Sequence, residues 1–283
     1  MLVGGRVIRL AGGVDGTRSA GGRRRVMAMR APVLQVQDVQ ARHGHRPVLG
    51  GDTADEGIRL RLDAGEWLAL IGPNGCGKTT LLRCIAGIHP LHAGHIRVLG
   101  HDLRTQPLQA KDRLGMAIAP EALPALLSAR ECLQLFAAAR GLRTVPQASL
   151  DLLEALGFMP WLDWRVGSLS LGGRQKLGIA LGLLGEPPLM LLDEPLNGLD
   201  LRSAAALKQH LRQRVADGTA VLMATHALDA AERHATRALV LLDGRLAAEC
   251  DAATLAAIRA DPQRSLEQVL LDALPAPGTG AQG

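Results

Sequence analysis

Residues 72–79 carry the spacing Gly-x-x-x-x-Gly-Lys-Thr, a pattern that binds phosphate chains. Small residues let successive backbone N–H groups face a phosphate, and the N-terminus of a following helix adds partial positive charge. Lys78 is expected to reach the β- and γ-phosphates, and the Thr79 hydroxyl to ligate Mg²⁺. The alternative is a glycine-rich turn that binds nothing. The residues predicted to contact a nucleotide are Gly72, Pro73, Asn74, Gly75, Cys76, Gly77, Lys78, Thr79 and Thr80.

Two adjacent carboxylates, Asp193 and Glu194, follow the apolar run 189–192. A buried strand that ends in acids presents them at the carboxyl edge of its sheet, where ligands of open α/β sheets bind. Successive side chains point to opposite sides, so Asp193 suits a Mg²⁺ ligand, directly or through water, and Glu194 can polarise an attacking water. Alone, the pair could be two exposed acids at a turn. Beside a phosphate-binding loop, it indicates a nucleotide hydrolase or a kinase.

These residues need strands and helices to position them, and hydrophobic patterning predicts both. Residues 67–71 form a short apolar run that stops at Gly72, which is typical of a buried strand entering a turn. Residues 78–86 have helical spacing. Further strands are expected at 33–39, 58–62, 189–192, 220–224, 238–242 and 246–249, the last two joined by a tight turn at 243–244, and helices at 128–140, 149–156, 170–185 and 201–215. This alternation predicts a parallel sheet covered on both faces.

The charge is distributed unevenly along the chain. Its 283 residues carry 32 basic and 27 acidic side chains, a net charge of +5 that would suit a nucleic-acid partner. Residues 1–30 hold seven Arg and one Asp, so the other residues hold 25 basic and 26 acidic side chains. Because the body of the protein is neutral and offers no basic stripe, no nucleic-acid partner is expected.

Composition limits the class of protein further. Four cysteines without CxxC spacing indicate a reducing compartment, and no apolar run is long enough to span a bilayer. With two Phe, three Trp and no Tyr, the core must be aliphatic. Residues 1–30 are rich in Gly and Arg and are predicted to be a disordered extension, with Met27 or Met29 as the expected true start.

Three further motifs complete the pattern. Residues 169–175 read Leu-Ser-Leu-Gly-Gly-Arg-Gln and open a predicted helix, with Ser170 placed 23 residues before Asp193. Residues 196–200 read Leu-Asn-Gly-Leu-Asp, and 224–226 read Ala-Thr-His. With these motifs, residues 33–249 resemble the ATP-binding cassette (ABC) ATPases. Glu121, followed by Ser128-Ala-Arg-Glu131, resembles the subgroup that serves ABC-2-type exporters. The resemblance implies an α/β P-loop NTPase fold with a parallel core sheet, an antiparallel β subdomain and an inserted α-helical subdomain.

The resemblance also implies an organisation and a mechanism. The ATPase domain would cover 31–249, its helical subdomain about 121–169, and a short helical tail 250–283. Two ATPase domains, alike or different, would form a head-to-tail dimer around ATP and Mg²⁺. Ser170 and Gly172 would contact the γ-phosphate bound by the opposite subunit, Glu194 would act as base on water, and His226 would orient the γ-phosphate. A separate transmembrane permease is implied, which places the chain in the cytoplasm on the inner face of the cell membrane.

Three positions depart from the family pattern. Leu171 replaces the first glycine of the motif at 169–175. Glu121 occupies the position of a glutamine, where a carboxylate could still ligate Mg²⁺ or its water. His43 falls where an aromatic residue stacks on adenine, and it is either that ring or a solvated loop histidine.

Two other functions fit the sequence less well. A soluble ABC ATPase acting on DNA or the ribosome is disfavoured because there is one cassette, and because the chain between Lys78 and Ser170 has no room for a long coiled coil. A P-loop kinase is disfavoured by the three further motifs. Glu121 and the short C-terminal segment favour export over import.

Overall fold

Strand β5 (Trp67–Ile71), which leads into the phosphate-binding loop, is buried along its whole length. The computed structural model describes residues 8–10, 31–51, 56–261 and 263–273, and within them β5 lies at the middle of a seven-stranded sheet. On one side of β5 the order is β11 (Arg237–Leu242), β12 (Arg245–Cys250) and β1 (Ile8–Leu10), and on the other β10 (Ala220–Thr225), β9 (Leu189–Asp193) and β8 (Leu114–Met116). All neighbouring strands run parallel except β11 and β12.

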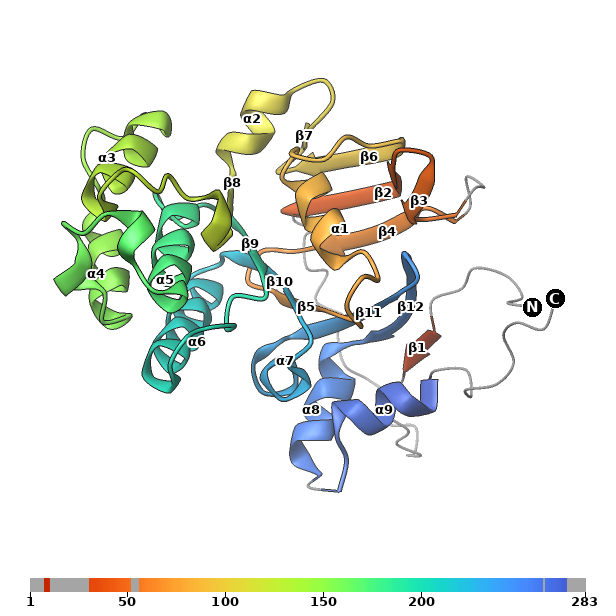
Figure 1. The fold of residues 1–283 in the computed structure, drawn as a ribbon. Coiled ribbons are helices and arrows are strands. Elements are labelled where there is room, and N and C mark those ends of the chain that lie inside the picture. Colours follow the sequence, from red (N-terminus) through yellow and green to blue (C-terminus); the bar gives the residue numbers. More distant parts are fainter. Residues whose placement is uncertain (1–7, 11–30, 52–55, 262, 274–283) are drawn as a thin grey trace, which may run out of the picture.

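A second sheet, which is antiparallel, lies beside the first (Figure 1). Its long strand β2 (Leu34–His43) pairs with β3 (Arg46–Leu49), β4 (Ile58–Leu62) and β6 (Ala93–Val98). Strand β7 (His101–Asp102) pairs with β6. Helix α1 (Lys78–Ile85) packs against both sheets, because Leu81, Leu82 and Ile85 are buried in one hydrophobic cluster with residues from each.

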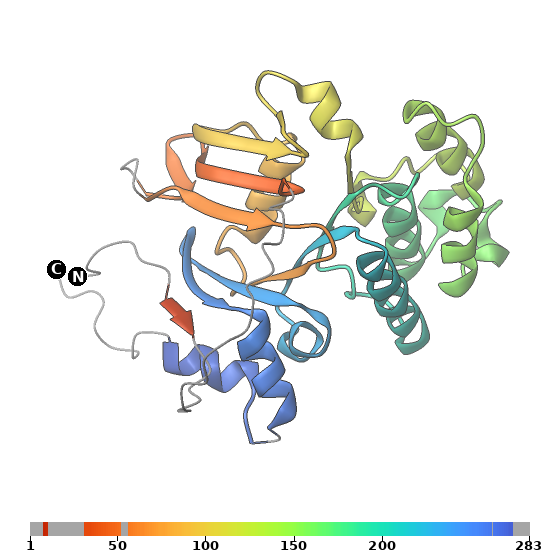
Figure 2. The ribbon, with the colours of Figure 1, turned by 180° about the vertical axis from the view of Figure 1, so that it is seen from behind.

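The opposite face of the parallel sheet is covered by the C-terminal half of the chain (Figures 1 and 2). Alternate side chains of β5 separate the two faces: Leu68 and Leu70 enter the first cluster, whereas Trp67, Ala69 and Ile71 enter the second. The helices on this second face are α6 (Leu201–Ala216), α7 (Leu228–His234), α8 (Ala252–Ala260) and α9 (Leu266–Ala273).

The helical part has a hydrophobic core of its own, at the side of the molecule away from β12 (Figure 1). It contains α3 (Ala129–Ala139), α4 (Gln147–Ala155) and the 3₁₀ turns η2 (Pro120–Ala122), η3 (Met159–Trp161) and η4 (Val166–Ser168); α2 (Pro107–Asp112) precedes β8. Helix α5 (Leu171–Gly182) joins this part to the sheet, since Leu177 and Leu181 enter the helical core while Ile179 packs on the sheet.

The predicted fold class is confirmed. Predicted strands 58–62 and 67–71 coincide with β4 and β5, and α3 begins with a complete capping box between Ser128 and Glu131. The expected helix 170–185 ends earlier, at Gly182. Within 1–30, predicted to lack regular structure, Ile8–Leu10 adds a parallel strand to the edge of β12, where backbone groups are available for pairing. The other residues of that segment lie outside the described residues.

Helix α5 approaches the chain after β8 backbone to backbone. A Cβ atom at Gly178 would lie 2.1 Å from the carbonyl oxygen of Ile118, and one at Gly182 would lie 2.2 Å from that of Met116. The two glycines are four residues apart and therefore share one helix face. The Ile118 N–H also donates a hydrogen bond to the Gly178 carbonyl at 3.0 Å. This contact fixes the helical part against the core sheet.

Gly178→Ala is expected to lower the free energy of unfolding by about 2 kcal/mol, because the new methyl group would force backbone apart. This loss outweighs the gain of about 1 kcal/mol that alanine brings to a helix interior. Urea unfolding measures the change. Gly173→Ala on the same helix is the control, since its Cβ would meet its nearest atoms at 3.4 Å, an ordinary contact. Equal stability of the two variants would contradict the close approach.

Candidate functional site

The loop between β5 and α1 is shaped by glycines. Gly75 and Gly77 have φ angles of 81° and 111°, in the left-handed region that favours glycine. Gly72 has no room for a side chain, because a Cβ would lie 2.2 Å from the Leu241 carbonyl oxygen. Helix α1 then begins directly at Lys78, with Gly77 as its N-cap. The loop 72–77, called the P-loop below, therefore ends on a helix N-terminus whose free N–H groups can meet an anion.

The Lys78 ammonium lies inside this loop. Its side chain is only 6% exposed, and Nζ donates hydrogen bonds to the carbonyl oxygens of Gly72 at 2.7 Å and Pro73 at 3.1 Å. The Glu194 Oε1 atom lies 3.9 Å from the same Nζ. A buried cation needs such partners, and these contacts hold its charge at the centre of the site.

Asp193 ends strand β9 with a carboxylate that is poorly solvated. Burial raises its pKa, and this effect exceeds the opposing influence of the Thr79 hydroxyl, which hydrogen bonds to the carboxylate, and of the positive charges on Lys78 and Arg83. Its Oδ1 atom is buried and has no hydrogen-bond partner among the described residues. A carboxylate oxygen that is buried, unpartnered and next to a hydroxyl is a suitable donor for a hard cation.

Glu194 follows Asp193 in an unusual backbone conformation. Its φ is 45°, in the left-handed region, and its N–H donates to the Ala224 carbonyl at 2.9 Å, which ties this turn to the end of β10. Its carboxylate meets His226, with Oε1 3.0 Å from the His226 Nδ1 and Oε2 3.4 Å from the His226 N–H. Strain of this kind persists where surrounding contacts over-determine it, and it is concentrated at functional sites.

These groups line one pocket of about 700 Å³, called the P-loop pocket below. Among the residues predicted from the sequence, the pocket is lined by Asn74, Gly75, Gly77, Lys78, Thr79, Thr80, Asp193, Glu194 and His43. His43 comes from the far end of β2 and has the only aromatic ring among the described residues of the lining. It contacts the His89 ring edge to face, with centroids 4.9 Å apart.

Other predicted residues lie elsewhere. Gly72 and Pro73 contribute their carbonyls to Lys78 rather than lining the pocket, and Cys76 is 5% exposed, with a thiol pKa raised by burial. Glu121 is exposed in η2 and is absent from the pocket lining, so the structure does not bring it to Thr79 and Asp193. His226 contacts Glu194 but is not among the residues that line the pocket.

Ser170 and Gly172 belong to a different pocket, on the helical part. Ser170 is the N-cap of α5 and accepts a hydrogen bond from the Gly173 N–H at 3.1 Å. A Cβ at Gly172 would lie 2.6 Å from the Gly198 carbonyl oxygen, so this glycine also allows the residues after Glu194 to pack on α5. The residues 169–175, called the signature segment below, do not meet the P-loop pocket within one chain.

Sequence reasoning missed part of the pocket lining. Arg46, Asp243 and Gly244 also line it, although 243–244 was predicted only as a tight turn. A Cβ at Gly244 would lie 2.3 Å from the Val48 carbonyl oxygen, so the turn between β11 and β12 packs directly on β3. Nothing in the local pattern of either segment signals this contact between residues far apart in the chain.

The fold and the site define a P-loop nucleotide-binding protein, in which a strand, a glycine loop and a helix N-terminus face two acids on a neighbouring strand. Comparison with known proteins gives the family: residues 56–197 match the family described as ABC transporter. The chain belongs to this family and is the ATP-binding subunit of an ABC transporter, an ATPase that binds nucleotide.

Individual relatives agree with this assignment. The chain is 33% identical over 224 residues to an uncharacterized ABC transporter ATP-binding protein of Bacillus subtilis (strain 168), covering 78% of this chain and 70% of that protein. It is 33% identical over 218 residues to a Nod factor export ATP-binding protein I of Burkholderia pseudomallei (strain 1710b), covering 76% and 70%. A solved ATP-binding subunit of an ABC transporter superimposes with a TM-score of 0.73 and 30% identity, covering 85% of this chain and 99% of that one.

Asp193→Asn is expected to raise the melting temperature of the nucleotide-free protein by a few degrees near neutral pH. An acid whose folded-state pKa is raised destabilises the fold once it is ionised, so the wild-type protein loses stability as pH rises through that pKa. The gain should vanish below the ordinary pKa of aspartate, where both proteins are neutral at this position. Thermal unfolding against pH measures it, with the exposed Asp229→Asn as control. A gain independent of pH would contradict this account.

Proposed function

We propose that this subunit binds ATP with Mg²⁺ in the P-loop pocket and uses hydrolysis of the γ-phosphate to drive export through a separate permease. The observation that carries this proposal is the convergence of Lys78, Asp193 and Glu194 on one pocket, from the ends of β5 and β9. One cation and two half-buried acids at a helix N-terminus are the groups that phosphoryl transfer to water requires.

The P-loop binds the phosphate chain in this proposal. The N–H groups of Gly75, Gly77 and the first turn of α1 donate to phosphate oxygens, with Thr80 helping to close this turn. Lys78 exchanges its contacts with the Gly72 and Pro73 carbonyls for the β- and γ-phosphates. This exchange keeps a buried ammonium paired throughout.

Thr79 and Asp193 would hold Mg²⁺. The unpartnered, buried Oδ1 of Asp193 and the adjacent hydroxyl are oxygen donors of the kind that this ion prefers. When bound, Mg²⁺ neutralises charge that develops on the β- and γ-phosphate oxygens. Glu121 would join this site only by movement of η2 toward the pocket, since it lies outside the lining.

Glu194 and His226 act on the attacking water. Glu194 accepts a proton from the water whose oxygen bonds to the γ-phosphorus, and ADP leaves with the electrons of the broken P–O bond. The contact of 3.0 Å between His226 Nδ1 and the Glu194 carboxylate orients that base, and the imidazole is placed to orient the γ-phosphate as well.

A second ATPase domain, identical or different, completes the site. Ser170 and Gly172 open helix α5 with an exposed N-terminus and lie outside the P-loop pocket of their own chain. In a head-to-tail dimer they would add donors to the γ-phosphate held by the opposite subunit. His43, exposed at the mouth of the pocket and backed by His89, would border the adenine.

Coupling to transport runs through the helical part. The described helices include none long and apolar enough to cross a bilayer, and we assign the membrane path to a separate permease. Leu126 and Leu135 are 84% and 52% exposed on this part, which suits a docking surface for that permease. The name of the Burkholderia relative supports export, and a subunit docked this way would work in the cytoplasm on the inner face of the membrane.

Glu194→Gln is expected to keep ATP binding, lower turnover at least about a hundredfold through loss of the base, and accumulate an ATP-bound dimer. Phosphate release measures turnover, equilibrium binding measures ATP affinity, and sedimentation velocity measures the dimer. The exposed Glu154→Gln controls for the loss of one charge. A Glu194→Gln protein with normal turnover would show that another group is the base.

Leu126→Asp is expected to remove most of the association with the proposed permease, because a charge replaces an exposed apolar contact. Leu271→Asp on α9 is the matched control, since Leu271 is 57% exposed and lies away from the helical part. Co-purification of the two subunits measures the effect. Equal loss in both variants would place the docking surface elsewhere.

A further inference from the structure

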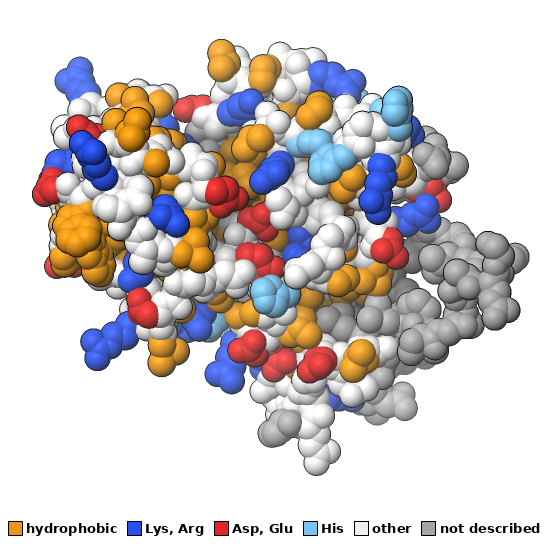
Figure 3. Space-filling view, in the orientation of Figure 1, with side chains coloured by type: hydrophobic (Ala, Val, Ile, Leu, Met, Phe, Trp, Pro, Cys, Tyr) orange, Lys and Arg blue, Asp and Glu red, His pale blue; other side chains and the backbone are white. Residues whose placement is uncertain are grey.

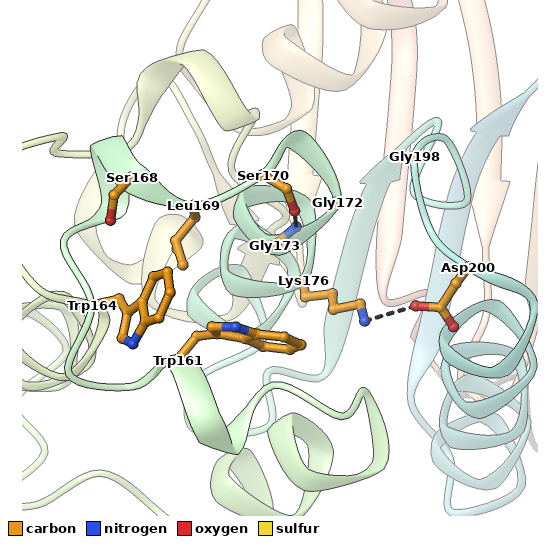
Figure 4. A pocket seen from close by; sticks show the side chains of 10 residues that line it. All are labelled: Trp161, Trp164, Ser168, Leu169, Ser170, Gly172, Gly173, Lys176, Gly198 and Asp200. Atoms are coloured by element: carbon orange, nitrogen blue, oxygen red, sulfur yellow. Dashed lines mark hydrogen bonds and ion pairs between the residues drawn. The ribbon is translucent and has the colours of Figure 1, made fainter.

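A second pocket of about 500 Å³ lies at the start of α5 and contains two of the three tryptophans of the chain (Figure 4). Trp161 and Trp164 line it together with Leu169, Ser170, Gly172 and Lys176. We call it the tryptophan pocket. It is continuous with the signature segment, because Ser170 and Gly172 belong to its wall.

The two tryptophans are unusually exposed for residues of this size. Trp161 is 36% and Trp164 53% exposed, whereas Trp67 in the core is 1% exposed. Figure 3 shows hydrophobic side chains gathered over this helical side of the molecule. The chain has only five large aromatic residues, and two of them are exposed to solvent in one pocket. Exposed apolar groups gathered in a hollow are typical of a binding site.

The Trp161 ring is held in place from two directions. It packs on the fully buried Phe158, with centroids 5.9 Å apart, and the Lys176 Nζ lies 5.8 Å from its centroid. Lys176 is in turn paired with Asp200 at 2.8 Å. Figure 4 shows the ring lying below this ion pair, with Trp164 beside Leu169. A fixed ring next to a neutralised charge pair is a suitable platform for a flat heteroaromatic base.

The P-loop pocket lacks such a platform. Among the described residues that line it, the exposed His43 has the only aromatic ring, and none is a tryptophan or phenylalanine. A phosphate chain held at Lys78 therefore leaves the attached base with little apolar surface within the same chain. The two pockets carry complementary halves of a nucleotide site: phosphate donors in one, and aromatic surface next to phosphate donors in the other.

We propose that the adenine of ATP bound in the P-loop pocket of a second copy of this chain packs in the tryptophan pocket. This inference rests on the head-to-tail dimer proposed above, in which Ser170 and Gly172 meet the γ-phosphate of that nucleotide. The base then follows the pocket wall from the signature segment to Trp161 and Trp164. His43 of the subunit that holds the phosphates borders the base, and the opposite subunit supplies the tryptophan rings on which it packs, so ATP joins the subunits through both of its ends.

The test uses the Glu194→Gln protein, in which ATP-driven dimers accumulate. Replacing both tryptophans by leucine (W161L/W164L) keeps both positions apolar and removes the rings. The ATP concentration needed for half-maximal dimerisation should rise at least about tenfold, because stacking on an aromatic ring contributes substantially to binding of each base. ATP affinity of the monomer, measured below the dimerisation range, should not change. W161F/W164F keeps the rings and should dimerise nearly as the parent does.

Tryptophan fluorescence gives a second readout that needs no change in the pocket. ATP should quench the emission of the Glu194→Gln protein as dimers form, leaving the emission of the buried Trp67, whereas inorganic tripolyphosphate with Mg²⁺ should not. Dimers that form without quenching, or a leucine variant that dimerises like its parent, would overturn the inference while leaving the proposed function intact. Failure of Glu194→Gln to dimerise with ATP would overturn the dimer, and the inference with it.

Discussion

The buried ammonium of Lys78 is the charge on which the rest of the site depends. A cation that is 6% exposed is stable only where fixed oxygens surround it, and here the Gly72 and Pro73 carbonyls and the Glu194 carboxylate do so. The P-loop therefore turns its carbonyls toward Nζ at 72–73 and then reverses direction before α1 begins at Lys78. The left-handed glycines at 75 and 77 make that reversal possible. Strand β5 fixes where it happens, because both of its faces are packed.

The acids are positioned by neighbouring parallel strands. Register between β9 and β10 places Asp193 opposite Ala224, and the Glu194 N–H then bonds to the Ala224 carbonyl. This contact holds Glu194 at a positive φ, from which its carboxylate lies between Lys78 and His226. The charged groups of the site thus follow the carboxyl ends of three adjacent strands, β5, β10 and β9, and the sheet sets how far apart these ends lie.

The signature segment is linked to this edge through the chain that follows Glu194. Gly172 permits the Gly198 carbonyl to approach α5, and Lys176 on the same helix pairs with Asp200. The residues that follow β9 therefore contact the surface that we propose to face a second subunit. The glycines at 178 and 182 connect the same helix to the chain after β8. Helix α5 consequently contacts the core sheet, the helical part and the residues after Glu194, as an ATPase coupled to a separate membrane subunit would require.

Much of this protein is determined by the sequence alone. The buried strands, the P-loop and its helix, the two acids and the capping box at Ser128 are predictable, because each depends on local spacing of apolar, glycine and polar residues. The tertiary structure decided what lies together across the chain: Arg46 and the turn at 243–244 in the P-loop pocket, Glu121 outside it, and Trp161 with Trp164 beside the signature segment. Such contacts join segments dozens of residues apart, and packing, register and loop paths set them rather than any period in the sequence. The sequence therefore determines the chemistry of each group, whereas only the folded chain decides which groups share a pocket.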